Sequence, residues 1–486
     1  MTSPSLTSRQ KDLALVLLAV TQFVIVLDAS IVNVALPSIG RALDFSQDNL
    51  SWVVNAYTLT FGGFLLLGGR LADLLGRRAI FIGGLALFSA ASLLGGLAQS
   101  DTWLIAARAV QGLGAALISP AALSMITTIF SEGAERNRAL GVWGAVAGSG
   151  GAAGVLLGGA LTQWISWEAV LFVNVPIGLL AAVAAPRLLP ESRDTRHRSF
   201  DVQGAVLVTG GLALLVYALV DANNAGWGTF HTIGLGAIAL ALIGAFVVWE
   251  ARAAHPIMPF SIFRLRTLRG ANVIGLLLGL SLFAMFFFLS LYMQQVLGYD
   301  ALKTGLSYLP LALMIIASAG VASQLTTRIG FKPVLVSGFL MLTGGLVWFS
   351  QVSAGGSYLG DVLFPSLVVG FGLGLAFVSV TIAAVMGTKP DEAGLASGLI
   401  NTSQQVGGAL GLAILSAIAT ARTNHVIAGG GHSQGFALTA GFQTAFLVGA
   451  AFTLAAALLA AVMISSADSR AHAEAAQAGE VAPVPA

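Results

Sequence analysis

Two charged residues lie inside helix-length apolar stretches of this sequence. Asp28 is the one acid in the run from Leu13 to Ile39, and Arg108 interrupts a second run. A charge at the centre of a bilayer costs about 2.5–3.5 kcal/mol on insertion scales, so it is rarely kept without a use. A carboxyl group in a dry, apolar setting can lose and regain a proton near neutral pH. Asp28 is therefore the first candidate for proton chemistry, and hydrogen bonding that ties helices together is the alternative.

Arg108 is predicted to lie at a depth comparable to that of Asp28. The first apolar run leaves the cytoplasm and the fourth returns to it, so at about 1.5 Å per residue both side chains reach the outer half of the membrane. A nearby guanidinium favours the ionised carboxylate, and movement between the two groups would gate proton release. The structural alternatives are a permanent ion pair and hydrogen bonds from Arg108 to a neighbouring helix backbone.

The composition is that of an all-α polytopic membrane protein. Among 486 residues, 57% are hydrophobic and 9% are charged, whereas roughly 25% of the residues in a soluble domain are charged. Apolar runs of about 20 residues are long enough to cross a bilayer as helices. We predict fourteen spans, at residues 13–37, 49–69, 79–98, 103–130, 138–162, 169–189, 201–221, 230–250, 270–294, 304–326, 333–352, 359–386, 395–420 and 437–464.

The arginines and lysines predict the orientation of these spans. With the N-terminus inside, most of the 23 basic residues fall in cytoplasmic connections, as the positive-inside rule requires. Arg41, Lys303 and Arg422 fall outside, and Arg108 lies within a span. No cleavage site clearly follows the first apolar run, which we interpret as a retained helix. The prediction is a multi-pass protein of the cytoplasmic membrane with both termini in the cytoplasm.

An internal repeat divides the chain. The segment Gly69–Arg78, between the second and third spans, has a weaker echo at Ser323–Lys332, between the tenth and eleventh spans. This spacing predicts two six-helix units with two inserted helices, arranged 6+2+6, and a site near the midplane between the halves. The predicted divisions are an N-terminal bundle (1–190), two additional helices with linkers (191–268), a C-terminal bundle (269–465) and a disordered cytoplasmic tail (466–486).

Five motifs follow one another along the chain, at residues 27–37, 69–78, 108–114, 174–178 and 401–408. At these spacings the chain, from about residue 12 to 465, resembles the major facilitator superfamily. Within that superfamily it resembles the fourteen-helix drug:proton antiporters of the EmrB/QacA type. Two positions depart from the family pattern. Val155 replaces a proline within Gly154–Gly159, which puts the expected backbone kink in doubt, and Glu168 stands where relatives commonly have arginine.

The resemblance assigns roles to three sets of residues. It gives Arg108 a part in proton transfer alongside Asp28. It makes a conformational gate of Gly69, Arg70, Asp73, Gly76, Arg77 and Arg78. Positive-inside anchoring is the alternative for that loop, although it does not explain Asp73. The resemblance also makes an antiporter-type glycine helix of Gly154, Gly158 and Gly159, for which tight helix packing is the alternative.

Aromatic and amide side chains are the candidates for cargo contact. Flat, amphipathic or cationic ligands bind through stacking, cation–π contacts and hydrogen bonds. Contact with lipid or with the membrane interface is the alternative for the aromatic residues. The substrate-binding candidates are Asn33, Trp52, Asn55, Tyr57, Phe286, Tyr292, Gln295, Asn401, Gln404 and Gln405.

The composition also argues against several classes of function. Cysteine is absent, and the six histidines fall in predicted loops or the tail without a metal-ligand spacing. The sequence has no Walker-type loop for ATP, and its net charge of +2 makes no basic patch for nucleic acid. One buried acid without a base beside it argues against an intramembrane enzyme. We expect no metal and no cofactor.

The predicted function is proton-coupled antiport of lipophilic, often cationic, drugs or antibiotics. Alternating access of the two halves would carry these molecules out of the cell, with protons and membrane lipids as the other partners of a monomeric protein. The alternatives are a dedicated exporter of one natural product, as in the self-resistance of a producer, and a lipid or metabolite transporter. The motifs are shared by broad and narrow exporters, so the sequence leaves the cargo open.

Overall fold

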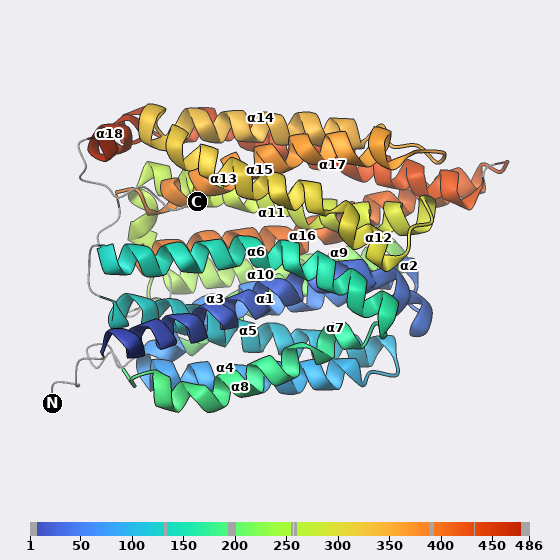
Figure 1. Ribbon diagram of the computed structural model, residues 1–486. Coiled ribbons are helices and arrows are strands. Elements are labelled where there is room, and N and C mark those ends of the chain that lie inside the picture. Colours follow the sequence, from blue (N-terminus) through green and yellow to red (C-terminus); the bar gives the residue numbers. More distant parts are fainter. Residues whose placement is uncertain are drawn as a thin grey trace.

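The computed structural model describes residues 7–130, 134–192, 201–253, 256, 260–387, 393–431 and 433–477, and every regular element in them is a helix (Figure 1). The hydrocarbon core of a membrane offers backbone groups no water, so a spanning segment must satisfy its own hydrogen bonds as a helix. The apolar runs of the sequence therefore become long helices that lie roughly side by side.

The elements fall into an N-terminal group, an inserted pair and a C-terminal group. The N-terminal group contains α1 (Ser8–Ala42), α2 (Gln47–Leu50), α3 (Trp52–Leu75), α4 (Arg77–Gly96), α5 (Asp101–Ile129), α6 (Ala134–Trp164), α7 (Ala169–Phe172) and α8 (Asn174–Leu188). The inserted pair is α9 (Val202–Ala225) and α10 (Phe230–Glu250). The C-terminal group contains η1 (Phe260–Arg264), α11 (Arg266–Leu291), η2 (Tyr292–Val296), α12 (Ala301–Ser307), α13 (Leu309–Ile329), α14 (Phe331–Phe349), η3 (Tyr358–Leu363), α15 (Phe364–Val385), α16 (Ala393–Ala428) and α17 (Gln434–Met463), and α18 (Ser466–Gln477) follows it.

Eleven helices in the described residues are long and apolar enough to cross a membrane. They include α1, α10 and α17, as well as composite spans such as α12 with α13. Three further helices, α3, α6 and α9, match the second, fifth and seventh spans that the sequence predicts. The chain is thus an all-helical, multi-pass membrane protein.

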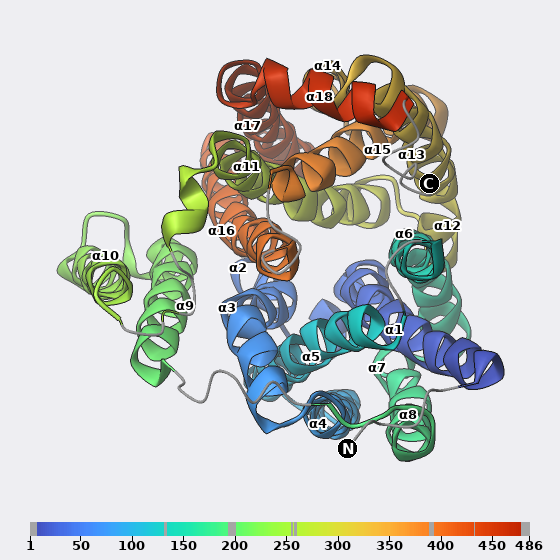
Figure 2. The same cartoon turned by 90° about the vertical axis from the view of Figure 1, so that its left-hand side faces the viewer.

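The same helix pairs pack together in both groups. In the N-terminal group α1 packs on α6, and both α3 and α4 pack on α5. In the C-terminal group α11 packs on α16, and both α13 and α14 pack on α15. The inserted helices α9 and α10 pack on each other at one side, where α9 also contacts α3 and α16 (Figure 2). The repeat in the sequence therefore has a counterpart in the packing.

The two ends of the bundle differ. We call the end where α1 begins and α18 lies the α18 end, and the opposite end the far end (Figure 1). Toward the far end the two groups are in close contact, because α12 packs against α6 and Gln294 Nε2 donates a hydrogen bond to Val34 O at 2.9 Å. These contacts hold the halves together at the far end.

The segment after α17 differs from the sequence expectation. We predicted a disordered tail from residue 466, but Ser466–Gln477 form helix α18, which packs on α13 and α14. Alanine favours helix, and Ser465 accepts a hydrogen bond from the backbone of Asp468 at 3.1 Å in the first turn. The prediction of disorder rested on the polar composition of this segment, which does not reveal the short face that packs on α13 and α14. Residues 478–486 of the predicted tail lie outside the described residues.

Helix α18 is docked on the connection between α13 and α14. The backbone N–H of Lys332 donates to Ser469 Oγ at 3.0 Å, and Gln477 Nε2 donates to Arg328 O at 3.1 Å. The His472 ring lies edge-on to Phe331, with centroids 5.7 Å apart. Burial lowers the pKa of His472, so this ring packs in its neutral form at neutral pH.

Gly330 is the position on which this docking depends most directly. Its φ is +84°, and a Cβ there would collide with the backbone oxygen of Ser469. We expect Gly330→Ala to cost about 1–3 kcal/mol locally and to loosen α18, because the strain cannot be relieved by a side-chain rotation. Trypsin should then cut faster after the exposed Arg470. The control is Gly355→Ala, at a glycine with open space around it. Equal cleavage rates in the two variants would contradict the prediction.

Candidate functional site

The two predicted intramembrane charges form a buried ion pair. Arg108 Nη1, on α5, lies 2.6 Å from Asp28 Oδ2, on α1. The side chain of Asp28 is 0% exposed and that of Arg108 is 1% exposed. The antiparallel course of α1 and α5 brings the two residues to one level, as the depth argument from the sequence predicts. Removing either partner alone would leave an uncompensated buried charge.

Two amide side chains complete the shell of the carboxylate, and a serine links them. Gln111 Nε2, one turn after Arg108 on α5, donates to Asp28 Oδ1 at 2.8 Å, and Asn174 Nδ2 on α8 donates to the same oxygen at 2.7 Å. Both amides also donate to Ser92 Oγ of α4 at 3.1 Å, and Ser92 Oγ donates to Leu171 O at 2.8 Å. Side chains of α5 and α8 therefore hold the carboxylate of α1, and Ser92 of α4 links the two amides.

The guanidinium of Arg108 has partners of its own. Its Nε donates to Val53 O of α3 at 3.1 Å, and its Nη1 donates to Gln111 Oε1 at 2.7 Å. Its Cζ lies 4.3 Å from the centroid of the Tyr57 ring, which gives a cation–π contact. The ion pair and the backbone hydrogen bond, two alternatives from the sequence, thus occur together. Tyr57, predicted as a cargo contact, lies in this charge cluster.

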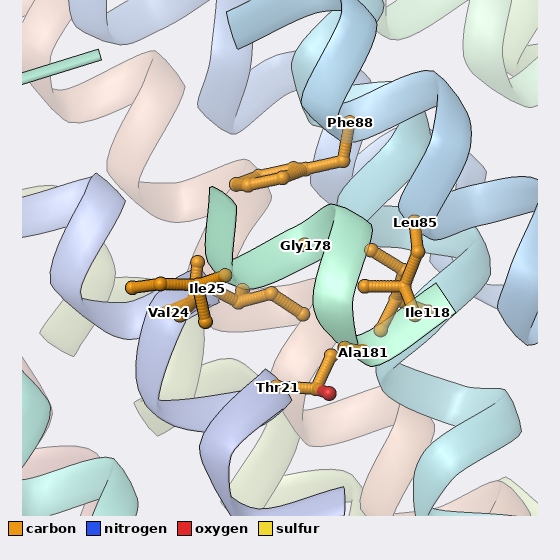
Figure 3. A pocket seen from close by; sticks show the side chains of 9 residues that line it. Thr21, Val24, Ile25, Leu85, Phe88, Ile118, Gly178 and Ala181 are labelled. Atoms are coloured by element: carbon orange, nitrogen blue, oxygen red, sulfur yellow. The ribbon is translucent and has the colours of Figure 1, made fainter. Parts of the chain in front are cut away.

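Figure 3 shows an apolar pocket, which lies about one helical turn of α4 and α8 from the cluster, toward the α18 end. It is lined by Thr21, Val24, Ile25, Leu85, Phe88, Ile118, Ile177, Gly178 and Ala181. Phe88 stands one turn from Ser92, and Gly178 stands one turn from Asn174. The Thr21 hydroxyl already donates to Leu17 O at 2.8 Å. The other lining residues are apolar, so this pocket offers water few hydrogen-bond partners.

The predicted gate loop is braced by the segment after α8. Arg78 Nη1 donates to Leu189 O at 3.1 Å, and its Nε lies 3.6 Å from Glu191 Oε2. The backbone N–H of Arg77 donates to Ser192 O at 3.1 Å. Gly76 has φ +114°, a conformation that favours glycine. Gly69 sits in ordinary contact with Pro120, Arg70 is half-buried, and the side chain of Asp73 lies outside the described part of the chain.

The predicted glycine helix joins the two halves. A Cβ at Gly158 would lie 2.6 Å from Ile31 O of α1, and one at Gly154 would collide with Ser30 Oγ. A Cβ at Gly159 would lie 2.6 Å from Ala301 O of α12, and one at Gly305 would lie 2.5 Å from Val155 O. Helix α6 runs unbroken through Val155. Gly305 was not among the predicted residues, because nothing in the sequence places it opposite α6.

Closing the far end should therefore be sensitive to a single methyl group at Gly159. We expect Gly159→Ala to weaken the α6–α12 contact by about 1–3 kcal/mol, because the clash is with backbone. A single cysteine placed at Asn55, which is fully buried, should then react about tenfold faster with a maleimide. Gly151→Ala on the same helix, where a Cβ has open space, is the control. An unchanged rate in Gly159→Ala would contradict the prediction.

The structure places the cargo candidates in several environments. Gln405 of α16 lies against Gly62 of α3. Asn55 stands two helical turns earlier on α3, and both of its amide atoms are buried without a hydrogen-bond partner in the described residues. Asn33 donates to Ala29 O at 3.2 Å. Among the aromatic candidates, Trp52 packs on Tyr217 and Phe286 packs on Tyr308. The Tyr292 hydroxyl donates to Ser353 O. Of the remaining amides, Gln295 is exposed, and Asn401 and Gln404 are half-buried. The predicted cargo residues therefore lie in different environments.

No role in the Asp28–Arg108 cluster was predicted for Ser92, Gln111 or Asn174. Gln111 and Asn174 stand in two of the motifs, and each is a buried amide in an apolar span, which is a signal that a partner is near. Ser92 carries no comparable signal. Single serines are common in apolar helices, where their hydroxyl usually bonds to a backbone carbonyl of the same helix.

The fold and this cluster define a class: a helical membrane transporter of two packed halves, with a buried charge site inside the N-terminal half. The Major Facilitator Superfamily pattern matches residues 18–412. The chain is 43% identical to the cephamycin export protein CmcT of Amycolatopsis lactamdurans, over 93% of this chain and 92% of that protein. It is 39% identical to the puromycin resistance protein pur8 of Streptomyces alboniger, over 92% and 90% of the two chains.

A solved structure shares the fold. The inward-facing, unoccupied bacterial homologue of the human lysosomal transporter Spinster superposes with a TM-score of 0.68 at 15% identity, covering 96% of this chain and 99% of that one. The chain belongs to the Major Facilitator Superfamily, and it is a transporter and not an enzyme.

Proposed function

We propose that this chain is a proton-coupled exporter of lipophilic, often cationic, antibiotics and drugs in the cytoplasmic membrane. The proposal rests on one observation above all. A fully buried carboxylate, Asp28, is paired with a buried arginine and held by donors from two other helices, α5 and α8. Burying a charge pair costs free energy, so stability by itself does not explain this arrangement. It suits a group that must change its charge during a transport cycle.

The proposed architecture has fourteen spans arranged 6+2+6, with α3, α6 and α9 added to the eleven apolar helices. The α18 end is cytoplasmic, so both termini lie inside. Arg78, Arg266 and Lys332 all lie at that end, in agreement with the positive-inside rule. The exporter acts as a monomer surrounded by lipid and uses the proton gradient without a cofactor.

In the proposed cycle, protonation of Asp28 from outside weakens its pairing with Arg108 and favours release of cargo. Loss of the proton to the cytoplasm restores the pair and completes the exchange. Cargo contacts come from the amide side chains of Asn33, Asn55, Asn401, Gln404 and Gln405. The gate loop 69–78 and the glycine helix control the exchange between the two states.

Export is tested with purified protein in liposomes under an imposed pH gradient. Ethidium, puromycin and a cephamycin should be tested side by side, with and without an uncoupler. Proton-dependent movement of ethidium together with the antibiotics would support broad export. A transport rate that is the same with and without the pH gradient, and with and without the uncoupler, would refute proton coupling.

A dedicated exporter of one natural product is the second candidate. The names of two similar proteins favour it, because each refers to a single antibiotic. Movement of one antibiotic without ethidium in the same liposomes would select this candidate. Proton-independent lipid movement would instead select a lipid transporter.

A further inference from the structure

Every described side-chain contact to the Asp28 carboxylate comes from a hydrogen-bond donor. Oδ2 accepts from Arg108, and Oδ1 accepts from Gln111 and Asn174. This set of partners suits the ionised group. A protonated carboxyl carries one O–H donor, which must find an acceptor in the same buried space. A buried donor without an acceptor is costly.

Most acceptors around Asp28 are already used. Ser92 Oγ accepts from both amides and donates its own proton to Leu171 O. Gln111 Oε1 accepts from Arg108. Asn174 Oδ1 is different, because it is buried and has no hydrogen-bond partner in the described residues. The Asn174 side chain itself is 0% exposed.

We propose that Asn174 is a positioning residue that serves both protonation states of Asp28. When the carboxylate is ionised, Nδ2 donates to it. When a proton from water binds the carboxylate, the amide turns by half a rotation about its last side-chain bond, and Oδ1 accepts the new O–H. The two ends of an amide have nearly the same shape, so the rotation needs no extra space. This inference rests on the proposed proton coupling.

The rotation exchanges the partners of Asn174: Oδ1 gains the new O–H, whereas Nδ2 gives up Asp28 and Ser92 Oγ and moves to the place of Oδ1, where no partner is present in the described residues. Ser92 Oγ can keep its bond from Gln111 when Asn174 turns. The charged and titratable groups that face Asp28 are Arg108 and, beyond it, Tyr57. After protonation, Arg108 retains Val53 O, Gln111 Oε1 and the Tyr57 ring as partners. Both charge states of the carboxyl are then satisfied.

Infrared difference spectroscopy of the full protein in lipid, cycled between low and high pH, tests the proposal. The carbonyl band of protonated Asp28 is identified as the one that Asp28→Asn removes. We expect Asn174→Leu, which is similar in size but cannot bond, to move this band to higher frequency, because the acid loses its acceptor. Asn174→Thr should move it back, since a hydroxyl can both donate and accept. We expect proton-driven transport by Asn174→Leu to fall about tenfold.

A matched control separates this effect from the loss of any buried amide. Asn272, on α11, is 7% exposed and bonds to Leu268 O and Ser403, so Asn272→Leu should leave the band in place. Suppose that the band is present in the wild type, absent in Asp28→Asn and unmoved in both Asn174 variants. That result would overturn the proposed role of Asn174 and leave the proposed proton coupling standing. If no band disappears in Asp28→Asn, Asp28 does not titrate, and the proposed proton coupling fails together with this inference.

Discussion

Asp28→Asn should abolish proton-driven export while leaving a folded protein. Asparagine keeps the size of aspartate and can still accept from Gln111 or Arg108, and Arg108 keeps Val53 O, Gln111 Oε1 and the Tyr57 ring as partners. Because Arg108 loses its counter-charge, the variant is less stable, and transport is compared at equal amounts of folded protein. It cannot bind and release a proton in the physiological range. Since the coupling step then has no carrier, we expect transport driven by a pH gradient to fall by about 100-fold or more. The measurement is antibiotic or ethidium flux in liposomes with an imposed gradient.

The control for this substitution is Asp44→Asn, which makes the same chemical change at an exposed site. Asp44 has φ +52°, a conformation that asparagine also adopts readily. This variant should transport at the wild-type rate. Full gradient-driven export by Asp28→Asn would contradict the assignment of Asp28, whereas slow downhill exchange of cargo without a gradient would agree with it.

Arg108→Leu should produce the largest loss of stability. It removes the guanidinium 2.6 Å from Asp28 and leaves a carboxylate that is 0% exposed without its counter-charge. Breaking a buried pair from one side costs about 3–5 kcal/mol, because the remaining charge is no longer compensated. The loss is measured as the change in the free energy of unfolding in mixed micelles.

The double variant Asp28→Asn with Arg108→Leu identifies the cause. It contains no unpaired charge, so it should regain much of the stability that Arg108→Leu loses, since buried pairs are often replaceable by uncharged groups. It should remain inactive in gradient-driven transport. A double variant as unstable as Arg108→Leu would show that Arg108 stabilises the protein mainly through Val53 O and Tyr57, and not through the pair.

The sequence alone determined the class of fold and the central pair of the site. Long apolar runs must become helices in a membrane, so helices could be located by counting residues. Asp28 and Arg108 could be matched because the rise per residue fixes depth along antiparallel helices. The motifs led to the superfamily, to which the chain belongs. The predicted roles of the gate loop, the glycine helix and the cargo residues stay predictions.

The tertiary structure alone decided which neighbours surround that pair and how the halves meet. Asn174 reaches Asp28 across 146 positions and Gln111 reaches it across 83, and depth does not reveal which face of a helix points inward or which helices are neighbours. For the same reason, the sequence did not predict that Gly305 lies opposite Val155 or that α18 docks on Lys332. Hydrophobicity places a residue along the membrane normal, whereas rotation and packing of helices, set by contacts between distant segments, decide what it touches.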